Sequence, residues 1–202
     1  MSFIACDWTK YFTDRQPEVI FDVGSYDGAD SIMFKRQWPM SSVFSFEAEI
    51  GNYNRFHDQC AINGVTYMHF VVSDVDGVMP FRASVGKYPY SGSIIEPDPE
   101  VFRRYPLMQF GPPVEVKSVT INTFCQVAGV KRIDILHMDV QGAEARVVSG
   151  FGGIRPYLVF AEMCAFEEYK SGMTPQKFKG IMAGLGYTIA EDLESDVLFK
   201  LG

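Results

Sequence analysis

Residues 18–28 read Glu-Val-Ile-Phe-Asp-Val-Gly-Ser-Tyr-Asp-Gly, and this stretch decides which class of fold the sequence predicts. Its first half is a short apolar run with a single acid, Asp22, which is typical of a buried strand. The run breaks at Gly24 into a turn that closes at Gly28. From Ala29 the apolar residues take up helical spacing. The stretch therefore predicts a strand, a glycine turn and a helix, which together form the entry to a nucleotide-binding site.

The acids and glycines of this turn favour one class of nucleotide. A dinucleotide fingerprint has three glycines that let bare backbone reach a pyrophosphate, whereas this turn has only Gly24 and Gly28. Asp22 and Asp27 stand beside them, and a carboxylate about 4 Å from a phosphate repels it by roughly 4 kcal/mol at a dielectric constant of about 20. S-adenosylmethionine has no phosphate and carries cationic groups, so the turn favours it. The alternative is that Asp27 caps the following helix and Asp22 is a turn acid.

Other acids also follow apolar runs that we expect to be strands. Glu47 follows the run 43–46 and lies about 20 residues after the glycine turn, where an acid that binds ribose hydroxyls stands in such units. Ser73 and Asp74 follow the run 67–72, and Asp74 is a candidate acceptor for an adenine amino group. The alternative interpretations are a solvated strand-end acid for Glu47 and a turn acid for Asp74.

Two more strands are expected at residues 133–139 and 157–161. Because strands alternate with helices along the chain, the sequence predicts an α/β fold with a parallel, doubly wound sheet and helices on both faces. Ligands bind beyond the carboxyl ends of the strands in such folds. We expect five strand-end acids to share that rim: Asp22, Glu47, Asp74, Asp139 and Glu162.

Length and turn residues indicate one domain with an irregular insertion. A chain of 202 residues can bury a sufficient core as a single domain over 1–202. The runs 187–190 and 197–201 predict a C-terminal hairpin, and hence one antiparallel edge strand. Residues 85–113 are rich in Gly, Pro and aromatic residues without a clear pattern, which is typical of a functional lid.

Composition narrows the classes of partner. The formal charge of −7 and the lack of a basic stripe argue against nucleic acid. The four cysteines, Cys6, Cys60, Cys125 and Cys164, form no C-x-x-C pair, so no metal site is expected. The first residues carry charges and no long apolar core, so we expect neither a signal peptide nor a membrane span, and a cytoplasmic protein.

At this point the chain resembles the S-adenosylmethionine-dependent methyltransferases of the FkbM type over residues 18–163. The most specific part of the likeness is the block Asp-Val-Gln-Gly-Ala-Glu at residues 139–144. The other residues that carry it are Phe21 to Gly28 with Ser31, Phe46-Glu47-Ala48, Val72-Ser73-Asp74, the strand Ile133 to Met138, and Glu162.

The resemblance implies a Rossmann-like, seven-stranded sheet and O-methylation of small molecules or sugars. It implies a cofactor site made by the turn residues Asp22, Gly24, Ser25, Asp27, Gly28 and Ser31, with Glu47 on the ribose, Ser73 and Asp74 near adenine, and Asp139 beside the reacting methyl group. Two positions depart from the family pattern: the usual Asn of the turn is Ser25 or Tyr26 here, and the usual Lys before Asp139 is His137.

Methyl transfer to a hydroxyl group profits from a base. Our hypothesis is that Asp139 or His137 takes the proton, while Glu162 and Glu144 position the substrate. The alternative for His137 is a residue of the wall. Asp139 and Glu162 are also candidates for holding a divalent cation.

The acceptor itself cannot be read from the sequence. In the expected lid, Ser93 and Arg103, together with Tyr88 and Tyr90, are candidates to face a sugar, a polyketide or a peptide, and the alternative is that they pack or are solvated. We expect a small-molecule or carbohydrate substrate, and the sequence leaves open whether the chain is a homo-oligomer. A nicotinamide-dependent dehydrogenase and a catalytically silent nucleoside-binding relative are the alternative functions.

Overall fold

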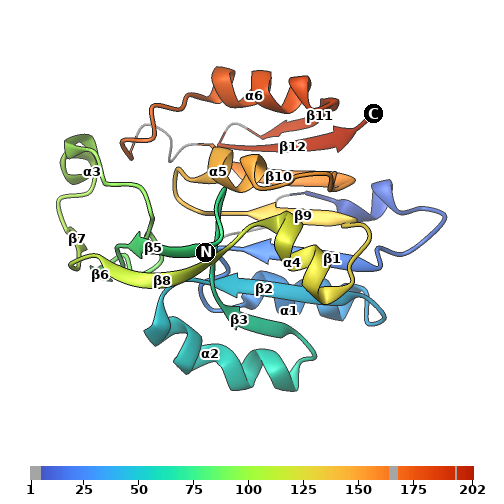
Figure 1. Ribbon diagram of the computed structural model, residues 1–202, viewed down its shortest axis with the longest axis horizontal. Coiled ribbons are helices and arrows are strands. Elements are labelled where there is room, and N and C mark those ends of the chain that lie inside the picture. Colours follow the sequence, from blue (N-terminus) through green and yellow to red (C-terminus); the bar gives the residue numbers. More distant parts are fainter. Residues whose placement is uncertain (1–5, 164–167, 194) are drawn as a thin grey trace.

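The computed structural model describes residues 6–163, 168–193 and 195–202. Its centre is a seven-stranded sheet with helices on both faces (Figure 1), and its strands lie in the order β11-β12-β10-β9-β1-β2-β3. These strands are β1 (Val19–Val23), β2 (Ser42–Glu47), β3 (Thr66–His69), β9 (Ile135–Met138), β10 (Leu158–Glu162), β11 (Tyr187–Leu193) and β12 (Asp196–Leu201). β12 runs antiparallel to both of its neighbours, and the other neighbouring strands are parallel.

The expected seven-stranded, mostly parallel sheet is confirmed, with one difference in the C-terminal hairpin. The antiparallel strand β12 lies one place in from the edge, and β11 forms the edge. Burial gives the reason, because β12 carries three consecutive buried residues, Val197 to Phe199, whereas β11 leaves Ile189 exposed. The strand with more apolar surface takes the inner position.

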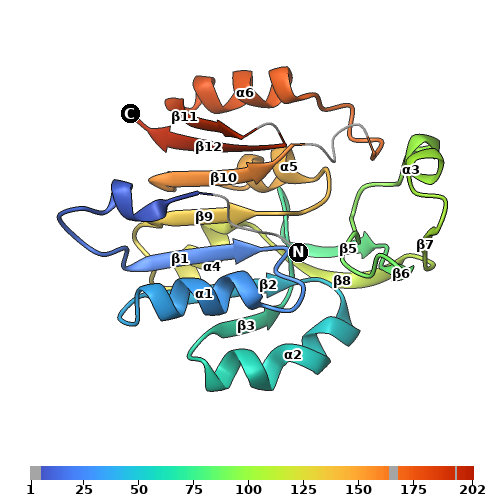
Figure 2. The ribbon, with the colours of Figure 1, turned by 180° about the vertical axis from the view of Figure 1, so that it is seen from behind.

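Two hydrophobic cores hold the helices against the sheet (Figures 1 and 2). The 3-10 helix η1 and helices α1 and α2 cover one face, and α4, α5 and α6 cover the other. Their bounds are η1 (Trp8–Tyr11), α1 (Ala29–Gln37), α2 (Ile50–Ile62), α4 (Ile121–Ala128), α5 (Glu144–Ser149) and α6 (Pro175–Gly184).

The alternation of side chains along β1 decides what its acid can reach. Ile20 belongs to the core under α1 and α2, and Phe21 belongs to the opposite core. Because successive side chains in a strand point to opposite faces, Asp22 shares the face of Ile20 and lies under α1. The parallel register places Asp22 beside His137 of β9.

The run 67–72, which we expected to be one strand, is divided between two sheets. β3 ends at His69, and β4 (Val71–Val72) pairs with β8 (Val114–Val119) in a three-stranded sheet that also contains β5 (Gly77–Phe81). Phe70 between them donates its backbone N–H to the carbonyl oxygen of Glu47 at 3.2 Å. The chain leaves the main sheet at this residue, a change of partner that an unbroken apolar run does not reveal.

Residues 85–113 contain more regular structure than we expected. They include α3 (Pro99–Arg104) and β7 (Met108–Phe110), which pairs with β6 (Ser84–Gly86). The Asp98 carboxylate caps α3 by accepting a hydrogen bond from the Glu100 amide, and Pro99 occupies the first turn. The expectation that this segment is irregular was therefore wrong for α3. The sequence did contain a signal for this helix, an Asp followed by a Pro at residues 98 and 99, which the expectation did not use.

Among the described residues, no helix combines the length and the hydrophobicity that crossing a membrane requires. Cys6, Cys60 and Cys125 are buried free thiols, and Cys164 lies outside the described residues.

Candidate active site

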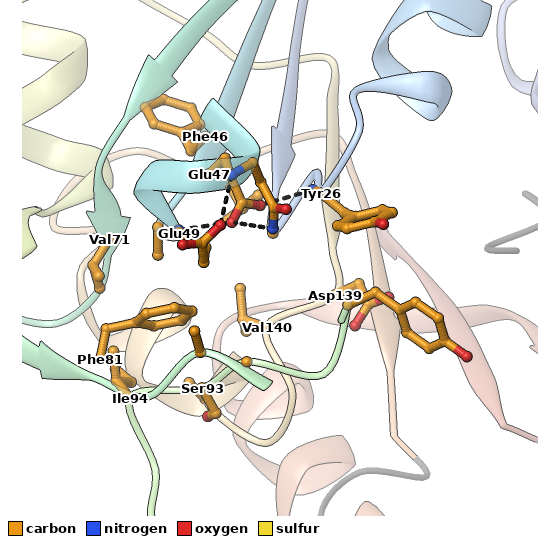
Figure 3. Close-up of a pocket in the computed structure, with 18 of the residues that line it drawn as sticks. Tyr26, Phe46, Glu47, Glu49, Val71, Phe81, Ser93, Ile94, Asp139 and Val140 are labelled. Atoms are coloured by element: carbon orange, nitrogen blue, oxygen red, sulfur yellow. Dashed lines mark hydrogen bonds between the residues drawn. The ribbon is translucent and has the colours of Figure 1, made fainter. Parts of the chain in front are cut away.

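A pocket opens at the carboxyl ends of β1, β2 and β9, where the strand-end acids were expected to meet (Figure 3). It holds about 590 Å³ of empty space, part of which is open to solvent. Glu47 and Glu49 lie on one side, and Phe81 and Ile94 lie on the other. The lining residues are Val23, Gly24, Tyr26, Phe46 to Glu49, Asn52, Phe70 to Val72, Phe81, Ala83, Ser84, Pro89, Tyr90, Gly92 to Ile94, Asp139, Val140 and Ala143.

The charge of this lining is one-sided. It contains three carboxylates, those of Glu47, Glu49 and Asp139, and no Lys, Arg or His among the described residues that form it. Such a wall repels a pyrophosphate and attracts a cation. An anionic pocket is therefore present in the folded chain. Of the five strand-end acids expected there, only Glu47 and Asp139 line it, and Glu49 is added to them.

Glu47 is the most buried of the three acids that line the pocket, with 6% of its surface exposed. Its Oε1 accepts hydrogen bonds from the Glu49 amide at 2.7 Å and from Asn52 Nδ2 at 3.4 Å. Its Oε2 accepts one from the Tyr26 amide at 2.8 Å, and a carboxylate oxygen can accept two. Burial raises the pKa of Glu47 to about 7, against the lowering effect of these hydrogen bonds. The expected ribose acceptor thus lines the pocket and keeps acceptor capacity.

Gly24 lies in the pocket lining and also provides a close contact between two turns. Its φ is +83°, and a Cβ at this position would lie 1.8 Å from the backbone oxygen of Asp139. Only glycine permits this approach. Gly24 therefore brings the turn after β1 against the turn after β9.

Of the other turn residues, Tyr26 lines the pocket, whereas Ser25, Asp27 and Gly28 do not. Ser25 Oγ donates to the Phe46 carbonyl oxygen at 3.2 Å, and Asp27 Oδ1 accepts from the Ala29 amide at 3.0 Å. Gly28 has a φ of +70°, and a Cβ there would lie 2.3 Å from Cys60 Sγ. In this structure the three residues make local and packing contacts, and Asp27 accepts the hydrogen bond that its capping alternative expects. Their cofactor contacts stay a prediction.

The expected cofactor contacts of the Asp22 and Ser31 side chains are not made in the pocket, because both side chains are fully buried beneath the turn. Ser31 Oγ donates to Asp22 Oδ2 at 2.6 Å, and Asp22 Oδ1 lies 2.8 Å from Nδ1 of His137. The His137 ring is 2% exposed and stacks on Phe160 with 5.2 Å between ring centroids. None of the three side chains lines the pocket.

Neither the expectation that His137 takes a proton from a substrate nor the alternative that it forms part of the pocket wall fits this buried ring, because His137 does not line the pocket. Its geometry follows from alternation, because His137 shares the face of Ile135 under α1. Asp139, two residues later, lies beyond the last paired residue of β9 and reaches the pocket.

Asp139 and Glu162 are joined by a residue that the sequence did not single out. The side-chain nitrogen Nε2 of Gln141 donates to Asp139 Oδ1 at 2.6 Å and to Glu162 Oε2 at 2.8 Å. Glu162 ends β10 and does not line the pocket, so its role in positioning a substrate stays a prediction. The described residues contain no group of three or more His, Cys, Asp or Glu side chains arranged to hold a metal ion.

Glu144 does not contact the pocket. It is fully buried, and its Oε1 accepts hydrogen bonds from the amides of Val140 at 3.2 Å and Gly142 at 3.4 Å. Burial raises the pKa of Glu144 to about 8. The expected role in positioning a substrate is corrected to a role in closing the loop after β9.

The two substrate candidates in the segment 85–113 differ in outcome. Ser93 lines the pocket, but its hydroxyl donates to the Gln141 carbonyl oxygen at 2.8 Å and accepts from the Ile95 amide at 3.0 Å. Arg103 lies outside the pocket and binds Glu100 on the exposed side of α3 at 2.6 Å, so its substrate contact stays a prediction that the pocket does not support. Tyr90, also proposed from the sequence, lines the pocket.

Ser73 and Asp74 lie just outside the pocket. Ser73 Oγ donates to Asp74 Oδ1 at 2.9 Å, and Arg146 lies 3.8 Å from the same carboxylate. The residues before them, Phe70 to Val72, line the pocket instead. Ser73 and Asp74 thus border the pocket without lining it, and their contacts with an adenine stay a prediction.

Sequence reasoning missed Tyr26, Asn52 and Gln141. Tyr26 has a φ of +47° and its ring lies 6.0 Å from that of Tyr90, between ring centroids. Its place in a glycine turn was a usable signal, because a non-glycine residue there takes a left-handed backbone only when the surroundings enforce it. Asn52 in the first turn of α2 is recognisable only after Glu47 is seen to end β2.

Comparisons with known proteins identify the family of this chain. The model of the methyltransferase FkbM domain matches residues 22–189. The 2-O-methyltransferase NoeI of Sinorhizobium fredii (strain NBRC 101917 / NGR234) is 29% identical over 143 residues, which cover 68% of this chain and 58% of that protein. The chain therefore aligns with less than two thirds of the length of this relative.

Solved structures of the methyltransferase domain of bacterial CtHen1 are more distant. One has a TM-score of 0.42 at 10% identity and covers 93% of this chain and 91% of its own. Another has a TM-score of 0.42 at 11% identity and covers 92% and 91%. The match over residues 22–189 shows that this chain belongs to the family of methyltransferase FkbM domains.

Proposed function

We propose that this protein transfers a methyl group from S-adenosylmethionine to a hydroxyl group of a small molecule or a sugar. The observation that supports this most strongly is the charge of the pocket, where Glu47, Glu49 and Asp139 are the charged lining residues. A cationic nucleoside without phosphates suits such a wall, and a nicotinamide dinucleotide with its pyrophosphate does not.

The residues of the pocket fit the proposed cofactor in polarity as well as in charge. Glu47 Oε2 has acceptor capacity for a ribose hydroxyl, because a single amide donates to it. Apolar walls for a purine come from Phe46, Val71 and Phe81. When bound, S-adenosylmethionine supplies an electrophilic methyl group.

Asp139 is the residue that we assign to the acceptor hydroxyl. Its Oδ1 is engaged by Gln141, whereas its Oδ2 accepts no hydrogen bond from a described residue. Asp139 lines the pocket, so Oδ2 is available to take the hydroxyl proton as the oxygen attacks. Holding the acceptor in line contributes further, since orientation supplies up to about 7–11 kcal/mol of a barrier.

The comparison with NoeI supports oxygen as the methylated atom, since that protein is named as a 2-O-methyltransferase. Tyr26 and Tyr90 at the pocket give apolar ring surface next to hydroxyl groups, which suits a hydroxylated ring such as a sugar.

Two measurements test the proposal. Calorimetry should show binding of S-adenosylhomocysteine and none of NAD at the same concentration. Labelled S-adenosylmethionine, incubated with the protein and fractionated small-molecule and glycan pools, should then transfer its methyl group in an Asp139-dependent way. Tight binding of NAD without binding of S-adenosylhomocysteine would overturn the proposal. Full turnover by Asp139→Asn would remove Asp139 from the assigned role.

A further inference from the structure

Gln141 links two acids that end neighbouring strands. A single amide nitrogen, Nε2, donates to Asp139 after β9 at 2.6 Å and to Glu162 at the end of β10 at 2.8 Å. An amide nitrogen carries two hydrogens, so both are used on these carboxylates. One oxygen of Asp139 and one oxygen of Glu162 are thereby held next to the same amide nitrogen.

The backbone of Gln141 is held in a conformation that its residue type rarely adopts. Its φ is +53°, and such strain persists only where the surroundings enforce it. Its carbonyl oxygen accepts from Ser93 Oγ at 2.8 Å. The Tyr169 hydroxyl, which donates to the Ser91 carbonyl oxygen at 2.5 Å, lies 3.4 Å from Gln141 Oε1. Ser93 of the segment 85–113 therefore holds the main chain of Gln141, and Tyr169 lies beside the oxygen of its side-chain amide.

The chemistry of an amide suits this place. Two carboxylates about 4 Å apart repel each other by roughly 4 kcal/mol at a dielectric constant of about 20, so unbridged they would turn apart or hold a proton. A lysine would neutralise one of them, whereas an amide donates to both and leaves both charges in place. The second oxygen of Asp139 is then available to the pocket.

We propose that Gln141 is the positioning residue of this site: its side chain orients Asp139 and Glu162, and its main chain couples them to the segment 85–113 that walls the pocket. This inference rests on the proposed function. It assigns the accurate placement of the base to a residue that does not itself line the pocket.

Two variants of Gln141 distinguish the loss of its N–H donors from the loss of its side-chain length. Gln141→Glu keeps the size of the side chain and removes both N–H donors. Gln141→Asn keeps the amide and tolerates a positive φ, but it is one methylene too short to bridge both acids. Gln126→Glu makes the same chemical change on an exposed residue of α4 and serves as the control.

With the acceptor from the transfer assay, we expect Gln141→Glu to lower kcat by about 100-fold, the lower end of what a general base contributes, and Gln141→Asn by less, about 10-fold. The KM for S-adenosylmethionine and the Kd of S-adenosylhomocysteine should stay within about threefold, because Glu47 is untouched. The double variant Gln141→Glu with Glu162→Gln restores a donor between positions 141 and 162 but none toward Asp139, so its kcat should stay as low as in Gln141→Glu.

A readout without an acceptor is the side-chain amide itself in a ¹⁵N-labelled protein. The Gln141 amide hydrogens should exchange more slowly than those of Gln126, and Glu162→Gln should shift their resonances. Rapid exchange like that of Gln126, or an unchanged kcat in Gln141→Glu, would overturn the inference. Equal losses of kcat, of S-adenosylhomocysteine binding and of thermal stability would also overturn it, by showing a purely structural role. Failure of the wild type to bind S-adenosylhomocysteine would instead reject the proposed function, and the exchange measurement would still decide on the amide bridge.

Discussion

Asp22 Oδ1 and His137 Nδ1 lie 2.8 Å apart across neighbouring strands, and the two side chains are 1% and 3% exposed. Ser31 adds a hydrogen bond from α1, so the pair joins two strands and a helix directly beneath the glycine turn. Asp22, which the sequence marked most clearly, thus holds the elements beneath the glycine turn together and does not line the pocket. Removing one partner of such a pair leaves the other buried without compensation.

We therefore expect Asp22→Ala to lower the free energy of unfolding by about 3–5 kcal/mol, as for other buried pairs that lose one partner. Urea unfolding of the purified variant measures it. Asp74→Ala, which removes a partly exposed acid outside the pocket, should cost under about 1 kcal/mol. Equal losses in the two variants would show that the Asp22 pair has no special role.

The pair also makes stability depend on pH. Burial alone would lower the pKa of His137, but the hydrogen bond and charge of Asp22 outweigh it and raise this pKa above 6.5. The protonated imidazole then contributes stability that is complete below pH 6.5 and is lost as the pH rises through the raised value. His137→Asn should therefore destabilise the protein more at pH 6 than at pH 9 in urea unfolding. The exposed His57→Asn provides the reference, and the same loss at both pH values would contradict the prediction.

Gly24 is predicted to be irreplaceable for packing reasons. In Gly24→Ala the new Cβ meets the Asp139 backbone oxygen at 1.8 Å, and φ is +83°, so we expect no stably folded protein. Gly180→Ala meets nothing within 4 Å in the exposed part of α6 and should gain up to about 1 kcal/mol. Thermal unfolding of both variants tests this, and a melting temperature near that of the wild type in Gly24→Ala would refute it.

Glu144 should limit stability at alkaline pH. The unfolded chain releases this proton near pH 4.5, whereas burial raises the pKa in the folded protein to about 8. Each pH unit in this interval therefore lowers the free energy of unfolding by at most about 1.4 kcal/mol. Glu144→Gln cannot titrate, so its melting temperature relative to the wild type should rise from pH 5 to pH 8. The exposed Glu18→Gln should show no such trend, and a parallel course of the Glu144→Gln and wild-type curves would disprove the effect.

Glu47 should make cofactor binding depend on pH near neutrality. Burial raises its pKa to about 7, and only the charged carboxylate is a strong acceptor for ribose hydroxyls. The Kd of S-adenosylhomocysteine should rise by up to about tenfold for each pH unit below 7. Calorimetry between about pH 5.5 and about pH 8 should show this in the wild type and in the control Glu115→Gln, which changes an exposed acid of β8 outside the pocket. In Glu47→Gln, binding should be weaker and almost independent of pH, and an unchanged pH dependence there would reject the assignment.

Local periodicity by itself determined much of the fold. The strand Val19 to Val23, the glycine turn and the helix from Ala29 follow from short-range patterns, because apolar spacing and turn residues act on neighbouring positions. The same patterns predicted the C-terminal hairpin and the parallel sheet. They also placed Glu47 and Asp139 at strand ends, and both line the pocket.

Tertiary structure alone decided which strand-end acids face the pocket. Asp22 turns inward to His137 because the register of two distant strands places them side by side, and Glu144 turns inward to cap its own loop. The bridging role of Gln141 is visible only in the folded chain, where Glu162 of the next strand accepts a hydrogen bond from its side-chain amide. The sequence thus determined the elements and their polar ends, while the pairing of strands, which joins residues far apart in the chain, selected the contacts that make the site.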